Sequence, residues 1–467
     1  MLFSSISFLY YFLPAVLLCY FILPFRLKNI VLLLFSLIFY FYGEPVYTLL
    51  MLGSTLSAYI HGILIDKYRG TGLSKVFLWS SVGISLLTLG FFKYADFFVE
   101  NVNALTGSDL PLLKLALPIG ISFYTFQTLS YTIDVYRGDA APQKSYVRLA
   151  TYVALFPQLI AGPIVRYTTV EAELSKRQHS FENFAEGIRR FAVGLGKKVL
   201  LADVLGAMAK ALYESPAPSV AGYWLYAVAI SLQLYFDFSG YSDMAIGLGR
   251  IFGFHFLENF NYPFISKSVA EFWRRWHISL GSWFRDYVYI PMGGNRVNTA
   301  KWFRNILIVW FLTGFWHGAD WNFIIWGLYF AAFLLLEKFW YNRIALHLPK
   351  LVSHLYVAVV IAVSFVIFSA DGVGGMVTDL KGMFFLDGLP LWTDATGYYL
   401  RSYCAPLIFG LLGATPLVKM AVERLREMGK GGFVIDLLEP VFLVVILLVA
   451  TAYFVDGSFS PFLYFRF

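Results

Sequence analysis

The sequence predicts an all-α, polytopic membrane protein, and three observations carry this prediction. Hydrophobic residues make up 59% of the 467 residues and the mean hydropathy is +0.66, whereas soluble domains average roughly 45–50% apolar residues. Several apolar runs reach the roughly 20 residues that a helix needs to cross a bilayer. Long continuous runs favour helices over barrel strands, because backbone groups in lipid must be hydrogen-bonded within the chain.

The apolar runs predict about 11–12 transmembrane helices, each near the length of one bilayer crossing. Those of the first part are residues 6–23, 30–42, 46–65, 76–92 and 115–135. Those of the second part are residues 191–213, 223–237, 306–318, 322–336, 351–369, 398–418 and 433–454. No repeat of 20–50 residues and no linker divides the chain, so we expect one membrane domain over 1–467, ending in an aromatic tail at 456–467.

Two further segments predict helices that enter and leave the membrane on the same side. Residues 149–165 contain Pro157 and Pro163 between two basic loops, and proline breaks the helical hydrogen-bond ladder. Residues 238–263 are interrupted by glycines and contain one basic residue, Arg250. Broken helices are tolerated at membrane depth where they are buried in protein or line a cavity.

Basic residues predict the orientation of the chain. Seven segments that fall on one side hold 27 of the 36 Lys and Arg: 26–28, 66–75, 137–148, 166–190, 265–304, 338–350 and 419–430. Cytoplasmic loops collect such residues, so His277 is expected on the cytoplasmic side, with membrane lipids around the chain. The tail lies outside if both broken segments are re-entrant. The net charge of +7 reflects this topology and does not indicate nucleic acid.

Composition also restricts the chemistry. The two cysteines, Cys19 and Cys404, provide neither a disulfide framework nor a cysteine zinc site. His277 and His317 are not at the spacing of helical metal ligands and no third ligand is evident, so no metal site is predicted. No Gly-x-Ser-x-Gly nucleophile elbow is present.

His317 is the first candidate catalytic residue, because an ionisable residue within a membrane span indicates function. Phe315, Trp316, Trp321 and Trp326 surround it in sequence. Burial favours the neutral imidazole, which suits a general base. Trp321 or Asn322 are candidates to donate to a developing oxyanion. The alternative is a histidine that is hydrogen-bonded between helices and serves packing alone.

His277 is the second candidate, within a segment rich in arginine and tryptophan. As one helix, this segment would place Trp273, Trp276, Leu280, Trp283 and Phe284 on one face. Guanidinium groups bind phosphates, so the expected donor-binding residues are Arg274, Arg275, Trp276 and Arg285. The alternative is an amphipathic helix lying at the lipid headgroups.

Two acids within a predicted interior segment, Asp237 and Asp243, stand beside Tyr241. Acids near membrane depth need partners. They indicate either a buried polar network or a contribution to a site.

Six motifs together resemble the membrane-bound O-acyltransferase family, and within it the bacterial alginate O-acetyltransferase-like members. They are Phe156-Pro-Gln-Leu-Ile-Ala-Gly-Pro-Ile, Gln233-Leu-Tyr-Phe-Asp-Phe-Ser-Gly-Tyr-Ser-Asp-Met-Ala, Asn261-Tyr-Pro-Phe, Glu271-Phe-Trp-Arg-Arg-Trp-His-Ile-Ser-Leu, Trp283-Phe-Arg-Asp-Tyr-Val-Tyr-Ile-Pro-Met-Gly-Gly-Asn-Arg and Trp316-His-Gly-Ala. The resemblance spans most of the chain, but the first hundred residues and 340–450 match mainly by hydropathy.

The resemblance implies a multi-helix fold around a central tunnel in a bacterial inner membrane. The family's catalytic histidine falls on His317 and its second histidine on His277. Acetyl-CoA would approach from the cytosol as donor substrate, with no bound cofactor. The acceptor would be an extracytoplasmic polysaccharide, or a separate acetyltransferase-like or esterase-like partner that completes its acetylation. D-alanyl transfer and peptidoglycan acetylation stay open.

The tail, Pro461-Phe-Leu-Tyr464-Phe-Arg-Phe467, resembles the aromatic C-terminal motif of small proteins that assist D-alanyl transfer to teichoic acids. This suggests that Tyr464 accepts the acyl group transiently. A phenol with a pKa of about 10 would need a base such as His317. The alternative is an aromatic anchor at the membrane interface.

Two functions of other classes compete with acyl transfer. Broken helices and polar residues at mid-membrane also occur in transporters, although repeated halves are not found here. A membrane scaffold that recruits an extracytoplasmic enzyme is the third possibility, and it predicts that both histidines are dispensable.

Overall fold

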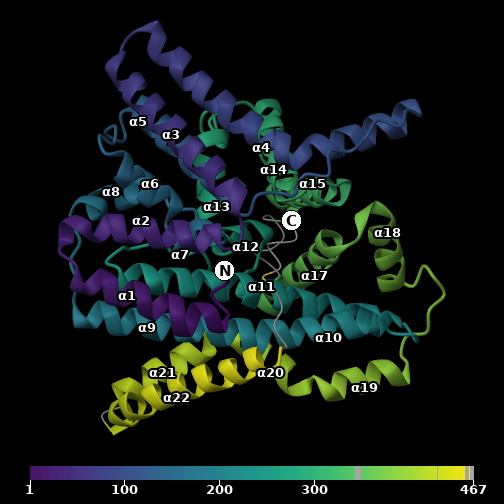
Figure 1. Ribbon diagram of the computed structural model, residues 1–467. Coiled ribbons are helices and arrows are strands. Elements are labelled where there is room, and N and C mark those ends of the chain that lie inside the picture. Colours follow the sequence, from purple (N-terminus) through teal and green to yellow (C-terminus); the bar gives the residue numbers. More distant parts are fainter. Residues whose placement is uncertain (342–348, 429, 458–461, 463–467) are drawn as a thin grey trace. The chain divides into compact units, whose positions relative to one another are not determined.

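The computed structural model describes residues 1–341, 349–428, 430–457 and 462, and every regular element in these residues is a helix (Figure 1). This confirms the predicted all-α class. The helices group into two compact units, one of residues 1–191 and 242–257 and one of residues 192–241 and 258–467. The single membrane domain expected from the sequence stays a prediction.

The first unit contains the N-terminal helices and the end of α11. Its elements are η1 (Ser7–Phe12), α1 (Leu13–Ile22), α2 (Phe25–Phe41), α3 (Pro45–Lys67), α4 (Gly72–Thr106), α5 (Ile121–Arg137), α6 (Tyr146–Ala154), α7 (Phe156–Leu159), α8 (Tyr167–Ser175) and most of α9 (Phe181–Gly196). Phenylalanines of η1, α2 and α7 form its aromatic core: the ring of Phe156 lies 5.3 Å from that of Phe12 and 5.6 Å from that of Phe39.

The second unit begins with the end of α9 and contains most of α11. Its elements are η2 (Lys197–Ala202), α10 (Asp203–Tyr213), α11 (Val220–Ile251), η3 (Pro263–Ile265), α12 (Val269–Arg275), α13 (Ile278–Phe284), η4 (Arg285–Tyr289), α14 (Thr299–His317), α15 (Trp321–Leu336), η5 (Glu337–Tyr341), α17 (Lys350–Ser369), α18 (Gly372–Met383), α19 (Asp394–Ser402), α20 (Cys404–Gly413), α21 (Leu417–Glu427) and α22 (Lys430–Val455).

Within the described part of the chain, five helices are long and apolar enough to cross a membrane, so the chain is a multi-pass membrane protein. They are Pro45–Lys67, Gly72–Thr106, Trp321–Phe339, Lys350–Ser369 and Gly431–Val455. The bent pair α20 and α21 makes a sixth if it is one span. Only 11% of the most apolar stretch of Gly431–Val455 is buried in protein, and such an apolar surface requires lipid. The predicted total of about 11–12 spans includes shorter helices as well.

The second re-entrant hairpin, expected at residues 238–263, is wrong in its first half. α11 continues as one helix to Ile251. Its glycines permit close helix packing instead of a break. In the second unit, a Cβ on Gly240 would lie 2.8 Å from the carbonyl oxygen of Gly194 on α9. In the first unit, a Cβ on Gly247 would lie 2.6 Å from that of Gly187.

Two other segments differ in how they break. Residues 149–165 are interrupted as predicted, because α6 ends at Ala154 and the four-residue α7 follows. Residues 398–418 were expected as one span, but they are divided among α19, α20 and the start of α21. The axes of α20 and α21 meet at 66°. Pro416, which precedes α21, lacks the N–H that would continue α20.

Candidate active site

α14 and α15 (Figure 1) pack against each other, and His317 is the last residue of α14. Both predicted segments are helical, and α15, continued into η5, is long and apolar enough to cross a membrane. Two glycines let the helices pack closely. A Cβ on Gly314 would overlap the carbonyl oxygen of Phe323, and one on Gly327 would overlap that of Trp310. Small residues allow such backbone contact between helices, so the position of His317 depends on them.

Aromatic rings enclose His317, which is 8% exposed. Its imidazole centroid lies 4.8 Å from Trp316, 5.0 Å from Trp326 and 5.4 Å from Phe368. Trp326 and Phe368 belong to α15 and α17, so three helices contribute to the enclosure. Such surroundings shield the imidazole of His317 from water.

His277 lies at a break in the chain, not within a continuous helix as expected. α12 ends at Arg275 and α13 starts at Ile278, with His277 between them at φ 45° and ψ 53°. Left-handed backbone is uncommon for residues other than glycine, and it often occurs at functional sites. The break turns His277 into the interior, where it is 1% exposed.

Asn259 determines which nitrogen of His277 carries the proton. Its Oδ1 accepts from the backbone N–H of Ser279 at 3.2 Å, so this atom is an oxygen. His277 Nδ1 lies 3.2 Å from the same oxygen and therefore donates to it. Burial lowers the pKa of His277 to about 3. The imidazole is neutral at pH 7, and Nε2 holds the free lone pair. Nε2 has no hydrogen-bond partner among the described residues.

Trp316 brings the two histidines into one aromatic cluster. Its ring centroid lies 6.3 Å from His277 and 4.8 Å from His317. Phe238 of α11 packs against the other side of the cluster, at 4.6 Å from the His277 ring. Residues 40 positions apart in sequence thus share one interior region of the second unit.

A cavity of about 330 Å³ opens beside His277, near the lower end of the range for small-molecule sites. Arg274 and Arg285 line it together with Tyr289. Thr313 of α14 also lines it. Thr313 precedes His317 by one helical turn and so shares a helix face with it. The cavity therefore contacts α14 one turn before His317, which is not among its lining residues.

Two of the four expected donor-binding residues do not line this cavity. Arg275 forms an ion pair with Glu271, with Nη2 2.9 Å from Oε1. Trp276 is buried and stacks on Phe272 at 5.5 Å. Arg285 lines the cavity but also pairs with Asp286 at 2.7 Å. Arg274 has no hydrogen bond to another described residue.

Sequence reasoning missed two residues that hold this segment in place. One is Asn259, described above. The other is Glu337, whose buried carboxylate accepts hydrogen bonds from the backbone N–H groups of Val269 and Ala270. These N–H groups start α12, where a negative charge is favourable. A buried acid at the end of an apolar span was the available signal.

The two residues expected to donate to an oxyanion have different surroundings, and that role stays a prediction. Asn322 Nδ2 lies 3.0 Å from the carbonyl oxygen of Ala370 and within 3.4 Å of two further carbonyls. Its donors are thus directed to the end of α17. Trp321 is 49% exposed. Asn322 ties α15 to α17, and this role is structural.

The acids of α11 have partners, as predicted for a polar network. Asp237 lies 2.8 Å from the Lys198 ammonium, which also contacts Asp203 at 2.7 Å. Phe462 of the tail is 1% exposed, with its ring 4.8 Å from Lys198 Nζ and 4.7 Å from the Tyr241 ring. Tyr464 lies outside the described residues. Among the described residues, no group of three His, Cys, Asp or Glu is placed to hold a metal ion.

Residues 138–377 match the model of the MBOAT, membrane-bound O-acyltransferase family. The chain is 45% identical to a probable alginate O-acetylase AlgI of Azotobacter vinelandii over 344 residues, 72% of this chain and 69% of the relative. It is 38% identical to one of Pseudomonas putida over the full length of both. It is 34% identical to a peptidoglycan O-acetyltransferase of Helicobacter pylori, over 90% of this chain and 88% of the relative.

The helical membrane fold and these matches define an O-acyltransferase of the membrane. The chain belongs to the membrane-bound O-acyltransferase family. This membership favours acyl transfer over the transport and scaffold alternatives.

Proposed function

We propose that the chain transfers an acetyl group from cytosolic acetyl-CoA to an extracytoplasmic polysaccharide, or to a separate partner that acetylates it, in a bacterial inner membrane. The observation that carries the proposal is the placement of both histidines around Trp316, with His277 lining a cavity that arginines also line. The polysaccharide rests on the names of the relatives: two are probable alginate O-acetylases and one is a peptidoglycan O-acetyltransferase.

In the proposed reaction His317 is the general base. It accepts the proton of the attacking hydroxyl as the new C–O bond forms at the thioester carbonyl. The tetrahedral intermediate then breaks its C–S bond, and the departing thiolate takes the proton from the imidazolium. The net result is one ester formed and one thioester consumed.

His277 serves the donor side in this scheme. It lines the cavity, and its Nε2 accepts a hydrogen bond in the tautomer that Asn259 imposes. Arg274 and Arg285 supply positive charge for the phosphates of the donor. Arg275 and Trp276 stabilise the segment that carries them.

Thioester consumption tests the assignment of His317. Membranes containing wild type, but not the His317→Ala variant, are expected to release CoA from acetyl-CoA when the acceptor is present. Equal release by both would remove His317 from the mechanism. Acetyl analysis of polymers from the same cells then separates an alginate-type acceptor from peptidoglycan. Incorporation of D-alanine instead of acetate would overturn the donor assignment.

Arg274→Gln tests the donor site separately from the chemistry. It is expected to raise KM for acetyl-CoA about tenfold with little change in kcat, because a charge-assisted hydrogen bond is lost. Lys301→Gln is the matched control, since Lys301 is exposed at the start of α14. Equal effects of both variants would point to general surface charge instead of a site.

The tail hypothesis is part of the proposal: Tyr464 holds the acyl group between donor and final acceptor. Phe462, two residues earlier, is buried in the second unit, which supports a tail that enters the protein. Mass spectrometry of the C-terminal peptide after incubation with acetyl-CoA is expected to detect an acetylated tyrosine. Full turnover by a Tyr464→Phe variant would contradict the proposal that Tyr464 carries the acyl group.

A further inference from the structure

Two buried cations lie beside one tyrosine in the first unit, far in sequence from His277 and His317. Lys28 of α2 is 8% exposed, and its Nζ is 4.4 Å from the centroid of the Tyr20 ring. Arg177, which follows α8, is 6% exposed, and its guanidinium carbon is 5.8 Å from the same centroid and 4.5 Å from that of Phe254. The partly exposed ring of His179 packs against Tyr20 at 5.5 Å.

Neutral groups supply all the described hydrogen bonds of Arg177. Its Nε donates to the Tyr20 hydroxyl at 3.1 Å, and Nη1 donates to Asn29 Oδ1 at 2.7 Å and to the backbone oxygen of Glu173 at 3.1 Å. Its Nη2 is enclosed and has no partner among the described residues. Lys28 makes no hydrogen bond or ion pair within the described part of the chain. Buried charges normally have an opposite charge beside them.

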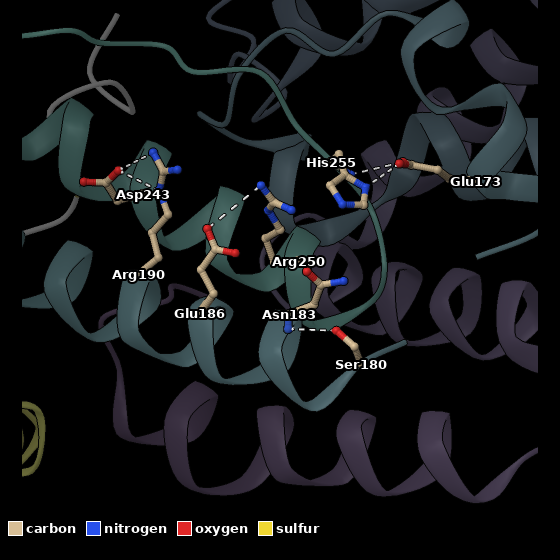
Figure 2. Close-up of polar contacts among 8 residues, drawn as sticks. All are labelled: Glu173, Ser180, Asn183, Glu186, Arg190, Asp243, Arg250 and His255. Carbon is tan, nitrogen blue, oxygen red and sulfur yellow. Dashed lines mark hydrogen bonds and ion pairs between the residues drawn. The ribbon is translucent and has the colours of Figure 1, made fainter. Parts of the chain in front are cut away.

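The carboxylates of neighbouring helices form their side-chain contacts with other residues and not with Lys28 or Arg177 (Figure 2). The pairs are Glu173 with His255 at 2.6 Å, Asp243 with Arg190 at 2.9 Å, and Glu186 with Arg250 at 3.9 Å. Glu173 attracts Arg177 electrostatically, whereas the charge that acts on Lys28 is the like charge of Arg177. Burial and the charge of Arg177 lower the pKa of Lys28, and burial together with both cations lowers the pKa of His179 to about 4.

The surface next to the cations is apolar and exposed. Phe21 is 42% exposed, Ile22 71% and Phe25 38%, and Lys28 Nζ is 5.3 Å from the Phe21 ring. A basic residue beside exposed aromatic and aliphatic side chains is typical of the membrane interface, where a phospholipid offers a phosphate next to its acyl chains.

We propose that Lys28, Arg177 and His179 form a binding site for the phosphate of an anionic phospholipid, whose acyl chains pack on Phe21, Ile22 and Phe25. Lys28 contacts the phosphate at the mouth of the site, and Arg177 adds its charge from within. The lipid completes the first unit by neutralising two buried cations. This site is independent of the acyl-transfer site proposed above.

The affinity of the purified protein for an anionic phospholipid tests the proposal directly. Purified full-length protein would be stripped of lipid in a neutral detergent, titrated with phosphatidylglycerol, and examined by native mass spectrometry. Wild type is expected to hold one lipid about tenfold more tightly than Lys28→Gln or Arg177→Gln, because each variant removes one charged contact. Lys176→Gln is the matched control, since Lys176 is adjacent and exposed, and it should bind as wild type does.

Parallel titrations with phosphatidylcholine, inorganic phosphate and CoA identify the source of the phosphate. Weaker retention of phosphatidylcholine supports an anionic lipid. Binding of phosphate or CoA that depends on Lys28, without binding of phosphatidylglycerol, would overturn the lipid assignment. Equal retention of phosphatidylglycerol by wild type and both charge variants would overturn the site.

Thermal unfolding gives a second measurement that does not need a retained lipid. In lipid-free detergent, Lys28→Gln is expected to melt at a higher temperature than wild type, since it removes the repulsion with Arg177. Added phosphatidylglycerol should then raise the melting temperature of wild type more than that of the variant. A variant that is less stable without lipid and equally stabilised by it would contradict the proposal.

Discussion

His277 and His317 lie in one aromatic cluster but are held by different means. His317 ends a regular helix, and rings from three helices surround it. His277 sits at a helix break with left-handed backbone, and an asparagine fixes its tautomer. The packing of α14 on α15 thus positions the helix end that carries His317, and a hydrogen bond to Asn259 orients His277. The two sites should respond differently to changes in packing and in hydrogen bonding.

The largest expected effect is on acetyl transfer, and it distinguishes the role of His317 from that of His277. His317→Gln should lower acetyl transfer by about 10²–10⁴-fold, the usual contribution of a general base. His277→Gln should lower it less and should also raise KM for acetyl-CoA, because this residue lines the donor cavity. Initial rates at varied acetyl-CoA give both parameters. A larger loss in kcat for His277→Gln would exchange the two roles.

Asn259→Ala tests the hydrogen bond that orients His277, and about a tenfold loss of kcat/KM is expected. The variant removes the acceptor of Nδ1–H, so the imidazole can change tautomer or rotate. Asn259→Asp keeps an acceptor at this position and should retain more activity near neutral pH. Its carboxylate would stabilise the imidazolium, so its activity should fall on acidification at a higher pH than in wild type. Identical pH profiles of wild type and Asn259→Asp would exclude this orienting contact.

The sequence predicted the features that repeat over many residues. Apolar length gave the helical membrane class, and the pairing of α14 with α15 around His317 followed from two adjacent apolar runs. Prolines in 149–165 correctly indicated a break there. Each of these signals is local, so it does not depend on knowing which helices pack together.

The misses arose where a residue acts on a distant partner. Gly240 and Gly247 suggested a broken helix, but they allow α11 to approach α9 closely. The break at His277 follows no proline or glycine. Asn259 and Glu337 orient the α12–α13 segment from 18 and 68 residues away from their respective contacts. Arg274 and Arg285 were recognised as candidates, yet periodicity could not distinguish them from Arg275, which pairs with Glu271.

The close packing of α14 on α15 positions His317, and the Gly327→Ala variant tests this contact. The added methyl would overlap the carbonyl oxygen of Trp310, so α14 and α15 must separate. Overpacking of this kind costs about 1–3 kcal/mol, and displacement of His317 should lower kcat. Gly374→Ala in α18 is the control, because its Cβ would meet nothing within 4 Å. Thermal unfolding and transfer rates would be measured on both variants, and equal behaviour would contradict the close contact.

A further prediction concerns the stability of the folded protein in acid, and the burial of His277 determines the direction of the effect. His277 stays neutral in the folded protein down to a pKa of about 3, whereas an unfolded histidine takes up a proton near pH 6.5. Between these values only the unfolded state gains the proton, so stability falls as pH drops from 6.5 towards 3, by at most about 1.4 kcal/mol per pH unit. His277→Gln should weaken this acid sensitivity in thermal unfolding at pH 7 and pH 5.

Asp379 of α18, in the same unit, should make stability depend on pH in the opposite direction. Burial raises its pKa to about 6, so ionisation is disfavoured in the folded state and stability falls as pH rises from about 4 to 6. Asp379→Asn should therefore stabilise the protein at pH 7 and have little effect at pH 4, whereas His277→Gln should have its benefit on the acid side. If both variants shifted the melting temperature by the same amount at every pH, the cause would be a change in packing. The protonation of His277 and Asp379 would then not explain the effect.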